Sequence, residues 1–200
     1  MNNQWDKRYS DSLYHYGREP NQFFKKEINE IAPGKILLPG EGEGRNAVYA
    51  ATLGWNVDAV DFSEEGKRKA DKLAAEFGVK INYQVQDFAK FFPPENYYEA
   101  VGIFFIHLDE ELRAALFSRL IRSLKPSGKI LLECFEKEQI KFSSGGPKDP
   151  SMLFSLEDVV NEFIDLEFEK LSREKVILNE GPGHSGEGMV IQFIGSRKQS

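Results

Sequence analysis

The sequence has little of several features that would assign it to a common class. One cysteine, Cys134, excludes an internal disulfide and fits a reducing compartment, so we expect a cytoplasmic protein with this thiol in its core. No window approaches 18 uninterrupted apolar residues, and the opening MNNQWDKRYSDS has no apolar segment; neither a membrane span nor a signal peptide is expected. Basic residues number 26 against 32 acidic ones, which argues against a nucleic-acid-binding surface.

What is present is an apolar content of 40%, enough for a core, and an alternation of strand-like and helix-like segments. Strands are predicted at 35–39, 55–61, 81–87, 99–105 and 129–135. Helices are predicted at 44–54, 63–78 and 109–128, with Ser63 and Asp109 as N-caps and Pro126 and Gly128 ending the last one. This alternation predicts right-handed crossovers and a parallel sheet covered on both faces.

The two ends of the chain depart from this pattern. After a helix near 155–165, strand-like segments at 166–180 and 188–198 are joined by the loop GPGHSGE at 181–187, which predicts an antiparallel hairpin. The first thirty residues are rich in aromatic residues and predict a helical flap. We therefore expect one α/β domain spanning 1–200, with a doubly wound, seven-stranded, mostly parallel sheet. Its parts are the flap (1–30), a cofactor-binding core (31–165) and the C-terminal hairpin (166–200).

The loop PGEGEG follows the first predicted strand and carries Gly40, Gly42 and Gly44. In a parallel α/β sheet this turn faces the ligand, and glycines let the backbone come close to it. A dinucleotide-binding G-x-G-x-x-G motif starting at Gly40 would place its third glycine at position 45, which is Arg45. A nicotinamide-dependent oxidoreductase is therefore the weaker alternative.

Two acidic residues end the next strands. Asp61 ends the second strand, where a carboxylate can accept hydrogen bonds from ribose hydroxyls, and Asp87 ends the third. A second carboxylate suits an adenine amino group, with Phe62 and Phe88 as apolar neighbours of the ring. The pattern predicts a cofactor that contains adenosine and no phosphates.

Several segments together resemble the class I S-adenosylmethionine-dependent methyltransferases, most closely the branch with the tellurite-resistance and thiopurine methyltransferases. The segments are LLPGEGEGRNAVYAATLGWNVDAVDFSEEG, VQDF, FFIHLDEELRAALFSRLIRSLKPSGKILLECF and GGPKDP, and the resemblance covers residues 5–197. It implies a Rossmann-like methyltransferase fold, with S-adenosyl-L-methionine as the cofactor.

The resemblance also implies site residues. In that family the glycine loop holds the methionine part of the cofactor, the acid after the second strand binds ribose, and the acid of the third strand binds adenine. The cofactor-binding set carried over or adjacent to these positions is Tyr16, Gly40, Glu41, Gly42, Gly44, Arg45, Asn46, Asp61, Phe62, Ser63, Gln86, Asp87 and Phe88. Leu38 stands where many relatives have an acid, and we expect Glu41 to take over part of its contact with the cofactor's ammonium group.

The acceptor and its catalysis are less defined by sequence. A sulfonium methyl is already activated, so a base is required only where the acceptor carries a proton. The candidates are His107, after the fourth strand, and His184, in the hairpin loop; a histidine that only holds its loop is the alternative for both. We expect the loops at 136–150 and 181–187 to meet above the methyl group, bringing Lys137 and Lys148 near His184.

The most direct interpretation is methyl transfer to a small molecule by a monomer or homodimer that binds neither nucleic acid nor membrane. A soft nucleophile, such as a thiol or a selenium or tellurium oxyanion, is one acceptor class. The alternative outside catalysis is a regulator that binds S-adenosylmethionine. No metal site is predicted.

Overall fold

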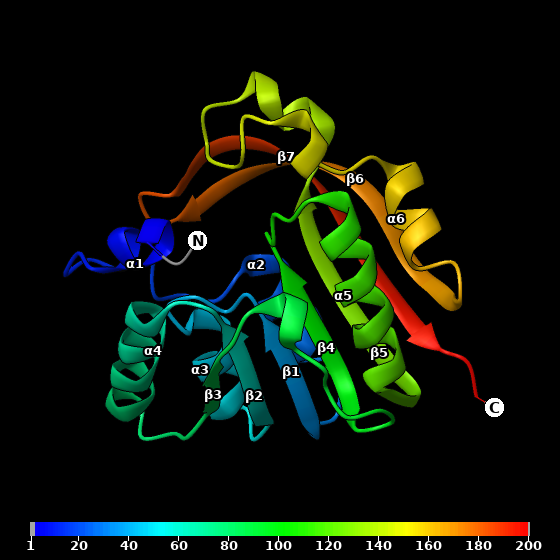
Figure 1. Cartoon of the computed structure of the whole chain (residues 1–200), viewed down its shortest axis with the longest axis horizontal. Coiled ribbons are helices and arrows are strands. Elements are labelled where there is room, and N and C mark those ends of the chain that lie inside the picture. Colours follow the sequence, from blue (N-terminus) through cyan, green and yellow to red (C-terminus); the bar gives the residue numbers. More distant parts are fainter. Residues whose placement is uncertain (1–2, 200) are drawn as a thin grey trace.

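A computed structural model describes residues 3–199 and shows one seven-stranded sheet with helices on both faces (Figure 1). The strands, in chain order, are β1 (Lys35–Pro39), β2 (Asn56–Asp61), β3 (Asn82–Val85), β4 (Tyr98–Phe104), β5 (Leu124–Phe135), β6 (Leu166–Glu180) and β7 (His184–Arg197). Their order across the sheet is β3-β2-β1-β4-β5-β7-β6. β1 to β5 are mutually parallel, and β7 is antiparallel to both of its neighbours. The predicted fold class is confirmed.

Two groups of helices cover the sheet. The helices are α1 (Asn3–Tyr9), α2 (Gln22–Ile28), α3 (Arg45–Thr52), α4 (Glu64–Glu76), α5 (Glu110–Ser123) and α6 (Leu156–Glu162), with short 3-10 turns η1 (Phe88–Lys90), η2 (Lys137–Lys141) and η3 (Pro150–Met152). Along β1, Leu37 belongs to the core beneath α5 and α6, whereas Ile36 and Leu38 belong to the core beneath α2 and α3. This alternation is what a strand buried on both faces requires.

The predicted boundaries are wrong at one helix end. The helix predicted at 109–128 ends at Ser123, and residues 124–128 are already part of β5. Lys125 precedes Pro126, and the proline ring disfavours helical backbone at the residue before it, so the chain becomes extended there. The predicted N-caps are confirmed: the side chain of Ser63 accepts from Gly66 N, and that of Asp109 accepts from Leu112 N.

The boundaries predicted for the hairpin loop, 181–187, are also wrong. β7 begins at His184, which pairs with Glu180, so only Gly181–Gly183 form the turn. Glycine-rich sequence favours a loop, but here the cross-strand pairing of β6 continues through Gly186 and Gly188. β6 runs parallel to β5, because both are antiparallel to β7, so the turn lies at the carboxyl edge of the parallel strands, as predicted.

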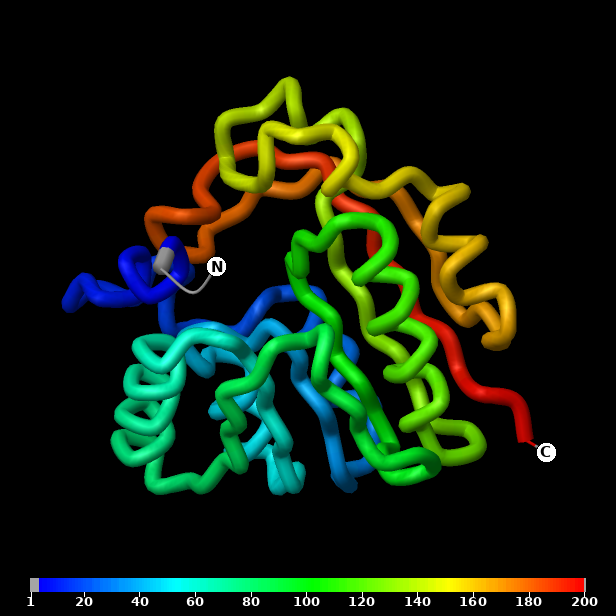
Figure 2. Tube along the Cα trace, viewed as in Figure 1, coloured from blue at the N-terminus to red at the C-terminus, as the bar shows by residue number. Residues whose placement is uncertain are grey.

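The sheet order reverses between β1 and β4, because the chain first builds outward to β3 and then returns to the other side of β1. Ligands bind in open α/β sheets at the carboxyl ends of the strands beside such a point. The N-terminal segment, residues 5–21, lies over this edge, beside the β6–β7 turn (Figure 2). Among residues 3–199, no helix is both long and apolar enough to cross a membrane.

Candidate active site

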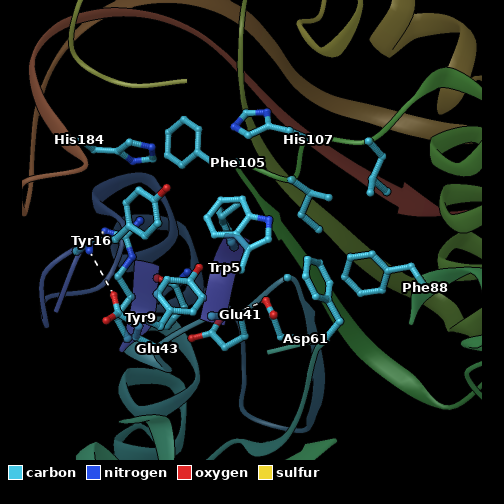
Figure 3. A pocket seen from close by; sticks show the side chains of 18 of the residues that line it. Trp5, Tyr9, Tyr16, Glu41, Glu43, Asp61, Phe88, Phe105, His107 and His184 are labelled. Atoms are coloured by element: carbon cyan, nitrogen blue, oxygen red, sulfur yellow. Dashed lines mark hydrogen bonds between the residues drawn. The ribbon is translucent and has the colours of Figure 1, made fainter. Parts of the chain in front are cut away.

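A cavity that is partly open to solvent lies at the carboxyl ends of β1, β2 and β4 (Figure 3). It is lined by Trp5, Tyr9, Tyr16, Gly17, Gly40, Glu41, Gly42, Glu43, Arg45, Asn46, Asp61, Phe62, Phe88, Phe104, Phe105, Ile106, His107, Leu108 and His184. Most residues predicted for the site are therefore gathered around one cavity. Ser63, Gln86, Asp87 and Gly44, although within the described residues, are outside its lining.

The glycine loop forms the floor of the cavity between β1 and α3. Gly40, Gly42 and Gly44 have φ of 66°, 59° and 89°, in the left-handed region that residues with a Cβ rarely adopt. A Cβ on Gly42 would lie 2.7 Å from the Tyr9 hydroxyl oxygen. The loop thus needs glycine both for its backbone and for the close approach of the N-terminal segment.

Glu41 is part of this loop and stabilises the start of α3. Gly44, at the N-cap position, has no side chain to accept a hydrogen bond, and Glu41 Oε1 instead accepts from Ala47 N at 2.8 Å. Burial raises the pKa of Glu41 to about 8, and the hydrogen bond from Ala47 offsets only part of this effect. Its predicted contact with the cofactor's ammonium group stays a prediction.

The raised pKa of Glu41 predicts a pH-dependent stability. Between its ordinary value of 4.5 and about 8, the folded protein keeps a proton that the unfolded chain has released. The free energy of unfolding therefore decreases as pH rises through this window. We expect Glu41→Gln to reduce this decrease, measured by urea unfolding across the window. The variant keeps some decrease, because burial also raises the pKa of Asp61 and Glu133. Identical pH dependence in variant and wild type would contradict the assignment.

Asp61 lies at the end of β2 and is 7% exposed. Its Oδ2 accepts from Gly42 N and its Oδ1 from Ser63 N, both at 3.0 Å, so the carboxylate joins the glycine loop to the start of α4. Burial raises its pKa to about 6. Each oxygen makes one of these bonds and keeps capacity for another, and the residue lines the cavity.

Only some of the residues predicted around adenine line the cavity. Phe62 and Phe88 line the cavity. Asp87 is exposed and caps η1 by accepting from Ala89 N at 2.9 Å, while Gln86 donates to Lys90 O. The adenine contact of Asp87 stays a prediction.

The N-terminal segment is held to the core by a buried ion pair that sequence reasoning missed. Glu43 Oε2 accepts from His15 N at 2.8 Å and Tyr16 N at 3.3 Å, and its Oε1 lies 2.7 Å from Lys69 Nζ. Lys69 also donates to Leu13 O at 2.6 Å. The only local signal is that Glu43 is an acid in a glycine loop, and nothing in the sequence identifies Lys69 as its partner.

Arg45 and Asn46, predicted as cofactor contacts, also hold this segment. Arg45 donates to Tyr16 O at 3.0 Å and pairs with Glu180 Oε2 at 2.9 Å. Asn46 Oδ1 accepts from Asn21 N at 2.9 Å. Both side chains line the cavity as well, and their predicted contacts with the cofactor stay predictions.

The far wall of the cavity carries both candidate histidines. His184 is 3% exposed and its Nδ1 lies 3.1 Å from Glu180 Oε2. His107 follows β4, and its solvent-inaccessible Nδ1 has no hydrogen-bond partner among residues 3–199. Burial lowers the pKa of His107 to about 4. Both side chains line the cavity, and sequence reasoning did not identify Glu180 as the partner of His184.

The loops predicted to meet above the site do meet, but their lysines are elsewhere. Ser185 N donates to Ser144 O at 3.2 Å. Lys137 pairs with Asp158 at 2.8 Å, and Lys148 is exposed and donates to Phe142 O. Neither lysine lines the cavity.

Comparisons with known proteins agree with this geometry. A family model described as a methyltransferase domain matches residues 36–128, just under half of the chain. The ubiquinone biosynthesis O-methyltransferase of Rickettsia conorii is 28% identical over 122 residues, which are 61% of this chain and 42% of that protein. The chain thus matches less than half the length of that curated relative.

Solved structures share the fold over nearly the whole chain. TehB from Haemophilus influenzae superposes with a TM-score of 0.73 at 18% identity, covering 98% of this chain and 67% of TehB. A structure from work on the conversion of a disulfide bond into a thioacetal group during echinomycin biosynthesis has a TM-score of 0.80 at 16% identity, covering 99% and 92%. The domain match and the shared fold are both those expected from the resemblance to the class I S-adenosylmethionine-dependent methyltransferases.

Proposed function

We propose that this chain transfers the methyl group of S-adenosylmethionine, the cofactor of its class, to a small-molecule acceptor. The observation that carries the proposal is one cavity with two different walls. The glycine loop and Asp61 lie on one side, and His107, His184 and Phe105 lie on the other. A cofactor on the first wall and an acceptor on the second would meet inside the cavity.

The residues present fit that cofactor. Asp61 has acceptor capacity on both oxygens, which suits two vicinal ribose hydroxyls. Phe62 and Phe88 offer apolar surface to a purine ring, and we propose Asp87, beside Phe88 at the rim, as a partner of the adenine amino group. When bound, the cofactor supplies a methyl group that its positively charged sulfur has already activated. The chain's own task is to position the acceptor and exclude water.

Two acceptor classes are supported by different observations. A soft nucleophile, such as a thiolate or a selenium or tellurium oxyanion, is supported by the likeness to TehB and needs no base. An acceptor hydroxyl is supported by the likeness to an O-methyltransferase and by the histidines, since a hydroxyl must lose its proton. Cys134 is buried, which fits the cytoplasmic location that we propose.

Calorimetry with S-adenosylhomocysteine and with NAD tests the cofactor. We expect saturable binding of S-adenosylhomocysteine and none of NAD; the reverse result would favour the oxidoreductase. Turnover of labelled S-adenosylmethionine with thiols, selenite, tellurite, phenols and carboxylates then tests catalysis. Binding without any methylated product across this panel would favour a regulator instead.

A small-molecule acceptor also predicts weak contact with nucleic acids. The net charge of −6 and the cavity beneath the N-terminal segment both oppose docking of a polyanion. We expect no retardation of RNA or DNA in gel-shift assays at low salt, where phosphate contacts would be strongest. Tight binding that weakens steeply with added salt would contradict the acceptor class.

A further inference from the structure

His184 and Glu180 form a buried pair across the β6–β7 turn. They are directly opposed in the hairpin register, so their side chains share a face, and Nδ1 lies 3.1 Å from Oε2. Glu180 also accepts from Arg45 at 2.9 Å and, through Oε1, from Asn21 at 3.0 Å. The carboxylate is thus held in place by three donors from three different parts of the chain.

This arrangement fixes which nitrogen of His184 carries the proton. Burial acts to raise the pKa of Glu180, but the hydrogen bonds from His184 and Arg45 lower it to about 2, so the carboxylate is ionised. An ionised carboxylate only accepts hydrogen bonds, which leaves the proton on Nδ1. Nε2 therefore carries the lone pair, and among residues 3–199 it makes no hydrogen bond.

The surroundings of His184 are aromatic. Its ring centroid lies 4.6 Å from Tyr16, 4.6 Å from Phe105 and 5.2 Å from Phe135. His107 stacks on Phe135 at 5.9 Å with an interplanar angle of 11°. The labelled side chains in Figure 3 show His184, Phe105 and His107 along one wall, facing Tyr16 and Trp5. Such walls favour a flat ring in the space between them.

The strained backbone of Phe105 is an independent observation that points to function at this wall. Its φ of 52° is in the left-handed region, which is strained for a bulky residue. Its backbone N donates to Glu133 O at 2.9 Å, which helps hold this conformation. Strain of this kind concentrates at ligand-binding and catalytic positions. Here it places the Phe105 ring beside the imidazole of His184 on the same wall of the cavity.

Resting on the proposed function, we propose that His184 is the general base of the reaction and that the acceptor is the hydroxyl of an aromatic ring, a phenol. Glu180 is a positioning residue, which orients the imidazole. His107, whose side chain lines the same wall of the cavity, is the second polar contact for the ring's substituents.

The step balances without a further reactant. His184 Nε2 takes the proton of the hydroxyl, while the phenol oxygen forms a bond to the methyl carbon and the bond from that carbon to sulfur breaks. The products are an aryl methyl ether, a neutral thioether and a protonated imidazole, whose positive charge Glu180 stabilises. Release of that proton to solvent restores the base.

The presence of a base is what selects a hydroxyl over the other acceptors. A thiolate or an oxyanion already carries its nucleophilic charge, and an aromatic amine, which is unprotonated near neutral pH, attacks through its own lone pair. A phenol is mostly protonated near neutral pH, so its reactivity depends on a base within hydrogen-bond reach. With the soft acceptors, the lone pair of His184 Nε2 would have no part in the reaction.

The expected pH dependence follows from the groups that face His184. These are Glu180 on β6, Arg45 on α3, His15 and Tyr16 in the N-terminal segment, and His107 after β4. Burial lowers the pKa of His184, with Arg45 and His15 acting the same way and Glu180 opposing them. The base is therefore unprotonated at neutral pH. The rate with a neutral phenol should rise with pH through a midpoint below 6.5 and then level off.

The test compares two phenols with wild-type protein and with His184→Gln. 4-Methoxyphenol is neutral at about pH 8 and needs the base, whereas 4-nitrophenol is largely ionised and does not. We expect His184→Gln to lower kcat/KM for 4-methoxyphenol by about 10²–10⁴-fold and for 4-nitrophenol by less than about tenfold. Lys148→Gln, an exposed position in the loop at 136–150 and outside the cavity lining, is the control and should change kcat/KM for neither phenol.

A second measurement does not depend on turnover. Nitrogen-15 NMR of labelled histidine should show His184 with its proton on Nδ1, and Glu180→Gln should raise the population of the other tautomer and shift the titration midpoint. Equal losses for both phenols, no methylation of either, or an unchanged tautomer in Glu180→Gln would overturn the inference. Failure of wild-type protein to bind S-adenosylhomocysteine would instead overturn the proposed function.

Discussion

Replacing Asp61 by alanine is expected to weaken S-adenosylhomocysteine binding more than tenfold. The substitution removes a charged acceptor for two hydroxyls, a loss of about 1.5–3 kcal/mol. It also removes the bonds from Gly42 N and Ser63 N, so the glycine loop loses its connection to α4. The two effects act in the same direction. Calorimetric titration of the folded variant measures the sum.

A variant on the same strand distinguishes the loss of a ligand contact from a general loss of structure. Asp58 bonds the Tyr98 hydroxyl at 2.9 Å and Asn82 at 2.7 Å, and it is outside the cavity lining. Asp58→Asn should leave the affinity within about twofold of wild type, because surface hydrogen bonds far from a ligand rarely couple to it. Unchanged affinity in Asp61→Ala would remove the ribose assignment and with it the orientation proposed for the cofactor.

Breaking the buried ion pair between Glu43 and Lys69 should have the largest effect on stability. Lys69 is 3% exposed and Glu43 is 4% exposed, so Lys69→Met leaves a carboxylate in the interior without its cation. Removing one partner of a buried ion pair lowers the free energy of unfolding by about 3–5 kcal/mol. The damage should be concentrated in the N-terminal segment, since Glu43 accepts the amides of His15 and Tyr16. Urea unfolding measures the loss, and hydrogen exchange at those two amides locates it.

The neighbouring Lys67 provides the matched control. It pairs with Asp71 on the surface of the same helix, where its side chain is 34% exposed. Lys67→Met should lower the free energy of unfolding by less than about 1 kcal/mol. Adding Glu43→Gln to Lys69→Met should recover part of the stability, because the unpaired charge is then removed. Equal costs for the two lysines would mean that the ion pair does not hold the segment.

The parallel core could be read from sequence because its signals are local. Apolar segments of strand length, Ser63 and Asp109 as caps and the glycines after β1 each act within a few residues. The hairpin turn was misplaced because its pairing is not local. His184 to Gly188 have the composition of a loop, and they become strand only through their partners on β6.

In the candidate site, too, residues with a local sequence signal were predicted and residues that depend on distant partners were not. The residues beside the glycine loop and at the end of β2 were predicted to share one site, since parallel strands bring their ends to one edge. Glu43, Glu180 and Phe105 were not identified. Their properties arise from partners at distant positions, such as Lys69 for Glu43, and a φ of 52° has no sequence signal in a phenylalanine.

The contact between the N-terminal segment and the β6–β7 turn has a consequence for biosynthesis. Gly183 N donates to His15 O at 2.9 Å, and a Cβ on Gly181 would collide with the backbone of Gly17. At about 5–20 residues per second, a ribosome needs roughly 10–30 s to make the partner of His15 after His15 itself. During that interval the aromatic side chains of the segment lack their final contacts and are available to chaperones. The contacts between this segment and the β6–β7 turn thus form only after the whole parallel sheet has been made.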